Sequence, residues 1–301
     1  MLRLITAGES HGKGIISILE GIPAGLSIKI KDIDLELIRR QSGYGRGARM
    51  KIEKDGAEIL SGIRQGRTLG SPITIFIKNR DWENNKNLMS EFPADKINAP
   101  LQKPRPGHAD LAGYMKYGVS DFRDILERAS ARETAGRAAA GAICKIFLKV
   151  FGINVYSFVS QIGGICADFE KLPLNKILIK AAKSPLSCPD EEASKKMIAL
   201  IEETAQKGDT LGGKFIVKIT GVPAGLGSHT QWDLKLDGRL AQSLMSIQAV
   251  KSVEFGLGSN LAGVLGSNAS DEIFYKKEKG FYRKTNRAGG IEGGMSNGEV
   301  I

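Results

Sequence analysis

Two of the three histidines in this 301-residue chain lie in glycine-containing loops beside polar neighbours. His11 follows Ser10 in GESHG, and His108 follows Pro106 and a glycine in RPGHAD, three residues after Arg105. Histidine is the side chain that gains and loses a proton near neutral pH. Each loop is therefore predicted to present a proton donor or an anion ligand. The plainer interpretations are a buried histidine in a turn and a surface histidine on a proline-stiffened loop. The third histidine follows GLGS and is expected at the surface.

Arginines gather in two short segments. RRQSGYGRGARM places Arg40, Arg46 and Arg49 among glycines, and RASARETAGR places Arg128 and Arg132 at the start of an expected helix. Arginine grips phosphate or carboxylate with two parallel hydrogen bonds, and the N-terminus of a helix attracts anions. The plainer interpretations are a solvated charged turn and a well-capped helix, since RASARE contains a serine and a glutamate at capping-box spacing. Together the segments predict binding of small anions.

Other chemical motifs are missing from the sequence. It has no Walker loop, no Rossmann GxGxxG after a strand, no zinc pattern and no cysteine–histidine dyad. The three cysteines, Cys144, Cys166 and Cys188, lack CxxC spacing and cannot all pair, which favours a reducing cytoplasm. Anion binding and proton transfer, without a metal, are the chemistry that remains.

The composition narrows the class of partner. Lys and Arg number 43 against 33 Asp and Glu, a net charge of +10, but aromatic residues are only 6%. A basic–aromatic RNA-binding signature is not found, so small anions are favoured over nucleic acid. A nucleic-acid-binding protein stays an alternative that rests on charge alone. No apolar run reaches the ~20 residues of a membrane span, and the apolar part of the N-terminus is too short for a signal peptide. A soluble chain is expected.

An internal repeat indicates that the fold does not require a histidine at position 11. Residues 8–26 match residues 208–226 without a gap, with eight of nineteen positions identical, including PAGL at the end of both copies. Ser10 faces a threonine in the second copy, whereas His11 faces Leu211. If the same strand and turn are built twice, histidine is not required there. A His11→Leu variant is expected to keep its fold and lose most of its turnover.

The hydrophobic pattern predicts an α+β fold, one domain over residues 1–301 with two related lobes. Strands are expected at 14–21, 26–30, 57–66, 72–78, 153–164 and 214–221. Helices are expected from Asp32 or Asp34 to Gly43, after a cap at Ser120, and at 133–151, 189–208 and 232–245. Long loops are expected at 80–105 and 256–290.

The motifs, taken together, resemble the chorismate synthase family. The matching segments follow the family order from end to end: GESHG, RRQSGYGRGARM, SGIRQGRTLGSPI, RPGHADLAGYMKYG, RDILERASARETAGRAAAGA, GDTLGG, SIQAVKSVEFGLG and NRAGGIEGGMSNGE. The resemblance implies a β-α-β sandwich with an internal pseudo-two-fold repeat. It implies conversion of 5-enolpyruvylshikimate 3-phosphate to chorismate and phosphate by 1,4-elimination, the last common step of the shikimate pathway. It also implies a cytoplasmic homotetramer that uses reduced FMN, with NADPH only as a reductant.

The resemblance also implies roles for single residues. His11 matches the histidine near the departing phosphate, a general acid, and His108 matches the histidine that protonates reduced FMN. Substrate-binding positions are matched by Ser10, Arg40, Arg46, Arg49, Arg105 and Arg132. Flavin-contacting positions are matched by Arg128, Ala129, Ser130, Gln248, Ala249 and Gly293.

Family members continue past GGMSNGE, whereas this sequence stops at Ile301. The resemblance therefore implies that a C-terminal segment with further flavin contacts and a catalytic aspartate is lacking. This leaves a second hypothesis, a ligand-binding remnant that holds FMN or substrate without turnover.

Overall fold

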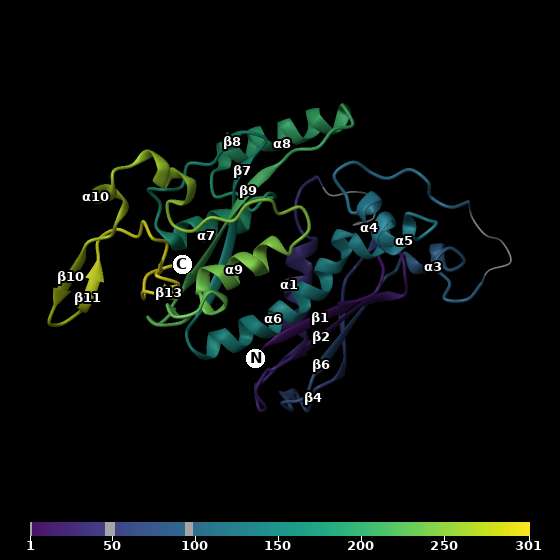
Figure 1. The fold of residues 1–301 in the computed structure, drawn as a ribbon, viewed down its shortest axis with the longest axis horizontal. Helices are drawn as coiled ribbons and strands as arrows, with labels where there is room; N and C mark the ends of the chain where they lie inside the picture. The colour runs from purple at the N-terminus through teal and green to yellow at the C-terminus, as the bar shows by residue number, and fades with distance from the viewer. Residues whose placement is uncertain (1, 46–51, 94–98) are drawn as a thin grey trace. The chain divides into compact units, whose positions relative to one another are not determined.

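The computed structural model describes residues 2–45, 52–93 and 99–301 (Figure 1). The chain folds into two compact units, Met1–Phe147 and Leu148–Ile301. Both contain helices and strands, so the predicted α+β class is confirmed. In the described part of the chain, no helix has both the length and the apolar character that crossing a bilayer requires.

The first unit is built on a four-stranded antiparallel sheet with the order β1-β2-β6-β3. In ITIFIK the alternate residues Ile73, Ile75 and Ile77 are fully buried, as period-2 patterning requires. The sheet strands are β1 (Arg3–Ala7), β2 (Gly14–Glu20), β3 (Ala57–Ser61) and β6 (Ile73–Lys78). The predicted hairpin of residues 57–66 with 72–78 is confirmed for 57–61, which pair with β6. Residues 63–64 instead form β4 (Ile63–Arg64), which pairs with β5 (Arg67–Thr68).

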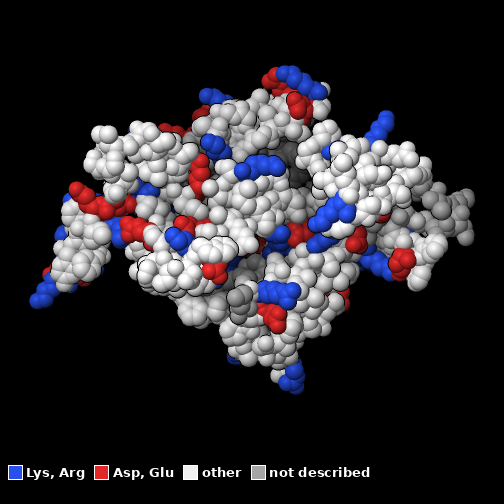
Figure 2. Space-filling model, in the orientation of Figure 1, with Lys and Arg blue, Asp and Glu red and all other residues white. Residues whose placement is uncertain are grey.

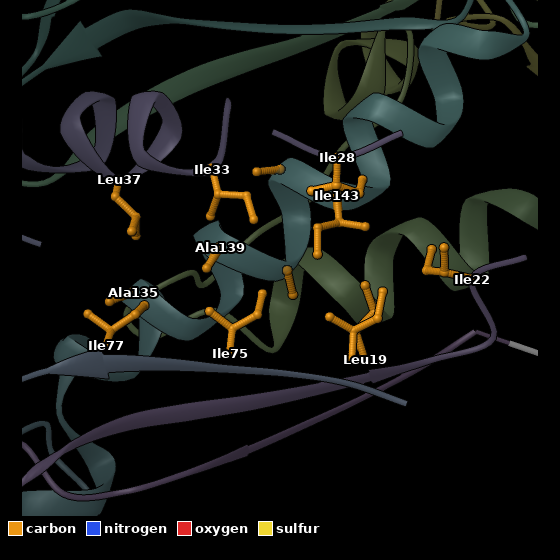
Figure 3. Close-up of a cluster of buried hydrophobic side chains, with 13 residues drawn as sticks. Leu19, Ile22, Ile28, Ile33, Leu37, Ile75, Ile77, Ala135, Ala139 and Ile143 are labelled. Atoms are coloured by element: carbon orange, nitrogen blue, oxygen red, sulfur yellow. The ribbon is translucent and has the colours of Figure 1, made fainter. Parts of the chain in front are cut away.

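Two helices, α1 (Ile30–Gln41) and α6 (Thr134–Val150), build the core of this unit with the sheet. Figure 3 shows Ile33 and Leu37 of α1 on one side of α6 and the sheet side chains Leu19, Ile75 and Ile77 on the other. The small residues of α6 allow this close approach. At Gly136, for example, even an added Cβ atom would lie only 3.0 Å from the side chain of Ile15. The predicted long alanine-rich helix is confirmed.

Shorter helices follow the sheet. They are α3 (Trp82–Asn85), α4 (Asp110–Tyr117), α5 (Arg123–Ala129) and the 3₁₀ turn η1 (Ala131–Glu133). The predicted cap at Ser120 is wrong: α5 begins at Arg123, and the Asp121 carboxylate accepts the backbone N–H of Arg123 at 2.8 Å. The predicted cap at Ser130 is found, with its hydroxyl accepting the N–H of Arg132 at 3.2 Å. The glutamate of the capping box, Glu133, instead binds Thr6 and Arg137.

The second unit contains a three-stranded antiparallel sheet with the order β8-β7-β9. Two small cores are formed around Met197 and around Phe158. The predicted helix at 189–208 is α8, and Asp190 caps it by accepting the N–H groups of Glu192 and Ala193. These elements are β7 (Asn154–Ile162), β8 (Ile165–Cys166), α7 (Leu174–Lys183), α8 (Glu191–Gln206) and β9 (Gly213–Thr220).

The rest of the second unit is made of short elements. The predicted helix at 232–245 is split into η2 (Trp232–Leu234) and α9 (Leu236–Met245). The expected loop at 256–290 contains η3 (Gly258–Gly263), α10 (Gly266–Ala269) and the hairpin of β10 (Ile273–Lys276) and β11 (Gly280–Arg283). A last hairpin is formed by β12 (Ile291–Glu292) and β13 (Met295–Ser296).

The expected strand at 26–30 is wrong. Only a single bridge joins Ser27 to Arg67, and α1 begins at Ile30, with Lys29 rather than Asp32 or Asp34 at its N-cap position. After this segment, Ile33 and Leu37 are buried four residues apart, which is the spacing of one face of α1.

The sequence repeat is visible in the hydrogen bonds of the two PAGL turns. In the first copy, the Thr68 hydroxyl donates to Pro23 O at 2.6 Å and accepts from Leu26 N at 2.9 Å. In the second copy, the Ser296 hydroxyl donates to Pro223 O at 2.6 Å and accepts from Leu226 N at 2.9 Å. One hydroxyl on a neighbouring strand therefore closes the same turn twice.

Candidate active site

The loop that carries His11 joins β1 to β2 and has little freedom. Gly8 has φ +101°, and a Cβ atom there would lie 2.1 Å from Gly14 O, so only glycine fits. Asn79, at the end of β6, is fully buried. Its Nδ2 lies 2.8–3.1 Å from the carbonyl oxygens of Glu9, Ser10 and Gly12. The buried side chain of Asn79 therefore fixes the loop to the end of the sheet.

His11 is fixed from a second direction by Glu127, near the end of α5. One carboxylate oxygen of Glu127 accepts the backbone N–H of His11 at 2.8 Å. Both oxygens lie 2.9 Å from the ring atom Nδ1. The Ser10 N–H also donates to the backbone oxygen of Glu127 at 2.9 Å. On the other side of the ring, Nε2 lies 3.6 Å from Asp81 Oδ2. The histidine side chain is 31% exposed, whereas that of Glu127 is 4% exposed.

Arg132 lies behind this loop and holds several segments together. Its Nε donates to Asn79 Oδ1 at 2.8 Å, and its Nη1 donates to both oxygens of Asp55 at 2.7 and 2.9 Å. Its side chain is only 5% exposed. Arg40 contacts the same Asp55 at 3.4 Å and donates to Thr134 and to the backbone of η1. The structure thus brings Ser10, His11, Arg40 and Arg132 into one network, in which Arg132 is engaged by protein groups.

Arg105 and His108 lie on the loop that leads into α4, which packs next to α5. Asp110 at the start of α4 is fully buried and accepts Nε and Nη2 of Arg105 at 2.9 and 3.0 Å. The hydrogen bond from Arg105 holds the pKa of Asp110 below its ordinary value despite burial, and the same bond raises the pKa of Arg105. Nδ1 of His108 lies 2.9 Å from Pro106 O, and its side chain is exposed.

The helix α4, which follows this loop, packs against α5. The rings of Tyr114 and Phe122 lie 5.0 Å apart, and the backbone N–H of Phe122 donates to Leu101 O at 3.0 Å. Gly113 lies against Ile125, because a Cβ atom there would be 2.5 Å from the isoleucine side chain. The two predicted catalytic histidines are therefore both fixed with respect to one short helix.

The predicted flavin contacts fall in both units. In the first unit, Arg128 donates to Gly8 O, Thr6 O and the Thr6 hydroxyl at 2.7–3.1 Å. All three acceptors are uncharged, so the guanidinium charge is not neutralised by them. Ala129 and Ser130 follow directly and are half-buried.

In the second unit, the flavin contacts predicted are Gln248, Ala249 and Gly293. Ala249 and Gly293 have φ values of +67° and +58°, and a Cβ atom at Gly293 would meet no other atom within 4 Å. Gly293 therefore leaves room for a ligand to approach the backbone. Arg46 and Arg49, predicted to bind substrate, lie outside the described residues.

Five residues that position the site were not predicted from the sequence: Asn79, Asp81, Asp55, Asp110 and Glu127. A signal was present for two of them, since the polar run NRD follows the apolar strand ITIFIK directly and must lie at the edge of the sheet. Glu127 carries no comparable signal, because a glutamate within a helix is expected to be solvated.

The comparisons with known proteins decide the family. The model of the chorismate synthase family matches residues 2–301. The chain belongs to the chorismate synthase family. It is 62% identical over 301 residues to chorismate synthase of Endomicrobium trichonymphae, covering all of this chain and 78% of that protein. It is 54% identical to chorismate synthase of Moorella thermoacetica, with the same coverage. A crystal structure of chorismate synthase superimposes with a TM-score of 0.85 at 48% identity, covering all of this chain and 82% of that one.

The resemblance and the fold inferred from the sequence are thereby confirmed. Chorismate synthases are lyases of the shikimate pathway, which leads to the aromatic amino acids.

Proposed function

We propose that this chain converts 5-enolpyruvylshikimate 3-phosphate to chorismate and phosphate, and that His11 is its general acid. The observation that carries the proposal is the fixed position of His11. Its loop is bound by Asn79 and Glu127, and the ring is held at Nδ1 at 2.9 Å. A general acid must be held within reach of the group that it protonates. In the second repeat copy Leu211 stands at this position, but its loop follows the helix α8 instead of a strand, so the repeat does not decide the role of His11.

The charge around the loop suits an anionic substrate with two carboxylates and a phosphate. Arg40, Arg46, Arg49 and Arg105 are proposed to contact it, together with Ser10. Arg105 lies on the loop of His108, and Arg40 is linked to the loop of His11 through Asp55, Arg132 and Asn79. Arg132 is proposed to hold the substrate-binding loops in place from the buried side of the site. Its side chain is 5% exposed, and Asp55 and Asn79 bind its guanidinium.

The family implies reduced FMN, which carries an anionic phosphate. In the first unit Arg128 suits an anion, because its guanidinium donates to uncharged acceptors, and in the second unit Gly293 leaves space beside its own backbone. These residues, with Ala129, Ser130, Gln248 and Ala249, are proposed to hold it. The chemistry that reduced flavin supplies when bound is electron density for the departure of phosphate and help in taking the ring proton.

His108 is proposed to hold a proton for the flavin. Nδ1 lies 2.9 Å from Pro106 O, a carbonyl oxygen that can only accept, so Nδ1 donates and Nε2 is the ring atom left to exchange a proton. We further propose that the protein is a cytoplasmic homotetramer. We also propose that NADPH serves only to reduce the flavin.

The direct test is an anaerobic assay of the chain with photoreduced FMN and 5-enolpyruvylshikimate 3-phosphate, following chorismate by absorbance. The proposal predicts chorismate and one phosphate per turnover. If no chorismate forms while the Moorella thermoacetica enzyme works under the same conditions, the proposal is wrong. Flavin binding without product would then favour a protein that holds its ligands without turnover.

A further inference from the structure

Glu127 is the one carboxylate with hydrogen bonds to both the backbone and the ring of His11 among the contacts resolved in the described residues. The backbone N–H lies 2.8 Å from Oε2, and ring Nδ1 lies 2.9 Å from both oxygens. The glutamate side chain is 4% exposed, whereas the histidine ring is 31% exposed. The carboxylate therefore lies on the buried side of the ring, and the exposed part of the ring is on the other side.

The chemistry of the two groups fixes the position of the ring proton. An ionised carboxylate only accepts hydrogen bonds, so Nδ1 must carry a hydrogen. In the neutral ring the lone pair is then on Nε2, and the proton that the ring gains and gives away is the one on Nε2. A carboxylate behind a histidine has this effect in catalytic triads and in metal sites, where it selects the tautomer and the ring orientation.

We propose that Glu127 is a positioning residue that locks His11 in the Nδ1–H form, so that Nε2 delivers the proton to the departing phosphate. The carbon–oxygen bond breaks with its electron pair on the phosphate oxygen, and that oxygen takes the proton from Nε2–H⁺. The ring C–H bond that is lost in the same 1,4-elimination supplies the electron pair of the new double bond. The inference rests on the proposed function of His11.

Asp81 lies on the delivery side of the ring, with its carboxylate 3.6 Å from Nε2. Its position is set by buried Glu53, whose carboxylate accepts the backbone N–H groups of Arg80 and Asp81 at 2.9 and 3.5 Å. At 3.6 Å the contact is too long for a hydrogen bond. The two sides of the ring thus differ: a tight hydrogen bond at Nδ1 and a charge contact at Nε2.

Glu127→Gln tests the lock with minimal change of shape. Glutamine can still accept the backbone N–H of His11 through its oxygen. Its NH₂ group would then face Nδ1 at the 2.9 Å position of Oε1, while its oxygen, also 2.9 Å from Nδ1, is already bonded by the backbone N–H at 2.8 Å. An N–H facing an N–H is unfavourable, so the ring proton is expected to shift to Nε2. We expect kcat to fall about 10- to 100-fold, as for losses of other groups that orient a reacting ligand, with KM for substrate nearly unchanged.

The readout that separates a lock from a merely structural role is ¹⁵N NMR of the histidine rings. Only three histidines give signals, and a His11→Asn variant assigns those of His11. Neutral wild-type His11 should be protonated at Nδ1, and Glu127→Gln should move that proton to Nε2. Asp190→Asn, which replaces another carboxylate that accepts backbone N–H groups, should leave the His11 signals and kcat unchanged.

The wild-type spectrum decides even if the variant fails to fold. An Nε2–H tautomer in the neutral wild-type ring overturns the proposal, as does Glu127→Gln with wild-type kcat. A wild-type chain that forms no chorismate but shows the Nδ1–H tautomer contradicts the proposed function and leaves the lock standing.

Discussion

At the scale of single residues, the candidate site depends on carboxylates and one amide that contact its basic groups from behind. Asn79 binds three carbonyl oxygens of the histidine loop, and Glu127 binds both the backbone and the ring of His11. Asp110 does the same for Arg105. Each of these groups is buried, so its hydrogen bonds are sheltered from competing water. The basic side chains are thereby held in place before any ligand binds.

Asp110 provides a prediction about acid stability. Its pKa is lowered in the folded chain by the hydrogen bond from Arg105. A group with a lowered folded pKa adds stability above its unfolded pKa and loses it as pH falls toward the folded value. The free energy of unfolding should therefore fall less between pH 7 and about pH 3 in Asp110→Asn than in wild type. Urea unfolding at both pH values measures this. An equal or larger fall in the variant would show that the pair does not contribute.

The sequence predicted the candidate groups better than their supports. His11, Arg40 and Arg132 were identified from loops rich in glycine and arginine, and the structure links them through Asn79 and Asp55. Glu127 was missed because its partner is 116 residues away in the chain, and local pattern says nothing about such a contact. Roles in binding and catalysis remain predictions.

At the scale of elements, strands and helices with strong periodicity were predicted correctly, and their ends were not. The strand of β6 and the alanine-rich α6 were found because burial repeats along them. The segment 26–30 failed because its apolar residues fit a strand and a helix equally well in so short a run. Leu26 and Ile28 bond the backbone of Thr68 and Gly66, but the run pairs through a single bridge, at Ser27, before α1 begins at Ile30.

The repeated turn gives the prediction at this scale. Thr68 and Ser296 are 3% and 4% exposed, and each hydroxyl bonds a proline carbonyl and a leucine N–H. Removing either hydroxyl removes two hydrogen bonds of the turn, each of which contributes about 0.5–1.5 kcal/mol. Thr68→Val and Ser296→Ala should therefore lower the free energy of unfolding by similar amounts. Chemical denaturation measures both.

Exposed Thr230 serves as the control, since Thr230→Val leaves no buried backbone group unpaired and should change stability little. If only one of the two turn variants is destabilised, the turns are alike in geometry but not in energy.

At the scale of the whole molecule, the net charge of +10 suits an anionic substrate. Figure 2 shows Lys and Arg side chains interspersed with Asp and Glu over the visible face, rather than gathered into one stripe. A dispersed positive charge attracts small anions from a distance and leaves final recognition to the arginines of the site.

Salt should weaken this attraction. The Debye length falls from about 30 Å at 0.01 M salt to about 3 Å at 1 M. We expect kcat/KM for 5-enolpyruvylshikimate 3-phosphate to fall about tenfold over this range of potassium chloride, because electrostatic steering is screened. The value of kcat at saturating substrate should change little. A kcat/KM that does not respond to salt would exclude steering by the net charge.

The central claim is that His11 delivers a proton to the departing phosphate. Its most direct test compares wild type with His11→Asn in the anaerobic assay with photoreduced FMN and 5-enolpyruvylshikimate 3-phosphate. Asparagine places an N–H near the position of Nδ1, so the bond to Glu127 is kept and the chain should stay folded, while no group remains to donate a proton at Nε2. We predict chorismate from wild type and a rate at least about 100-fold lower from the variant. A folded His11→Asn variant with wild-type turnover would contradict the claim.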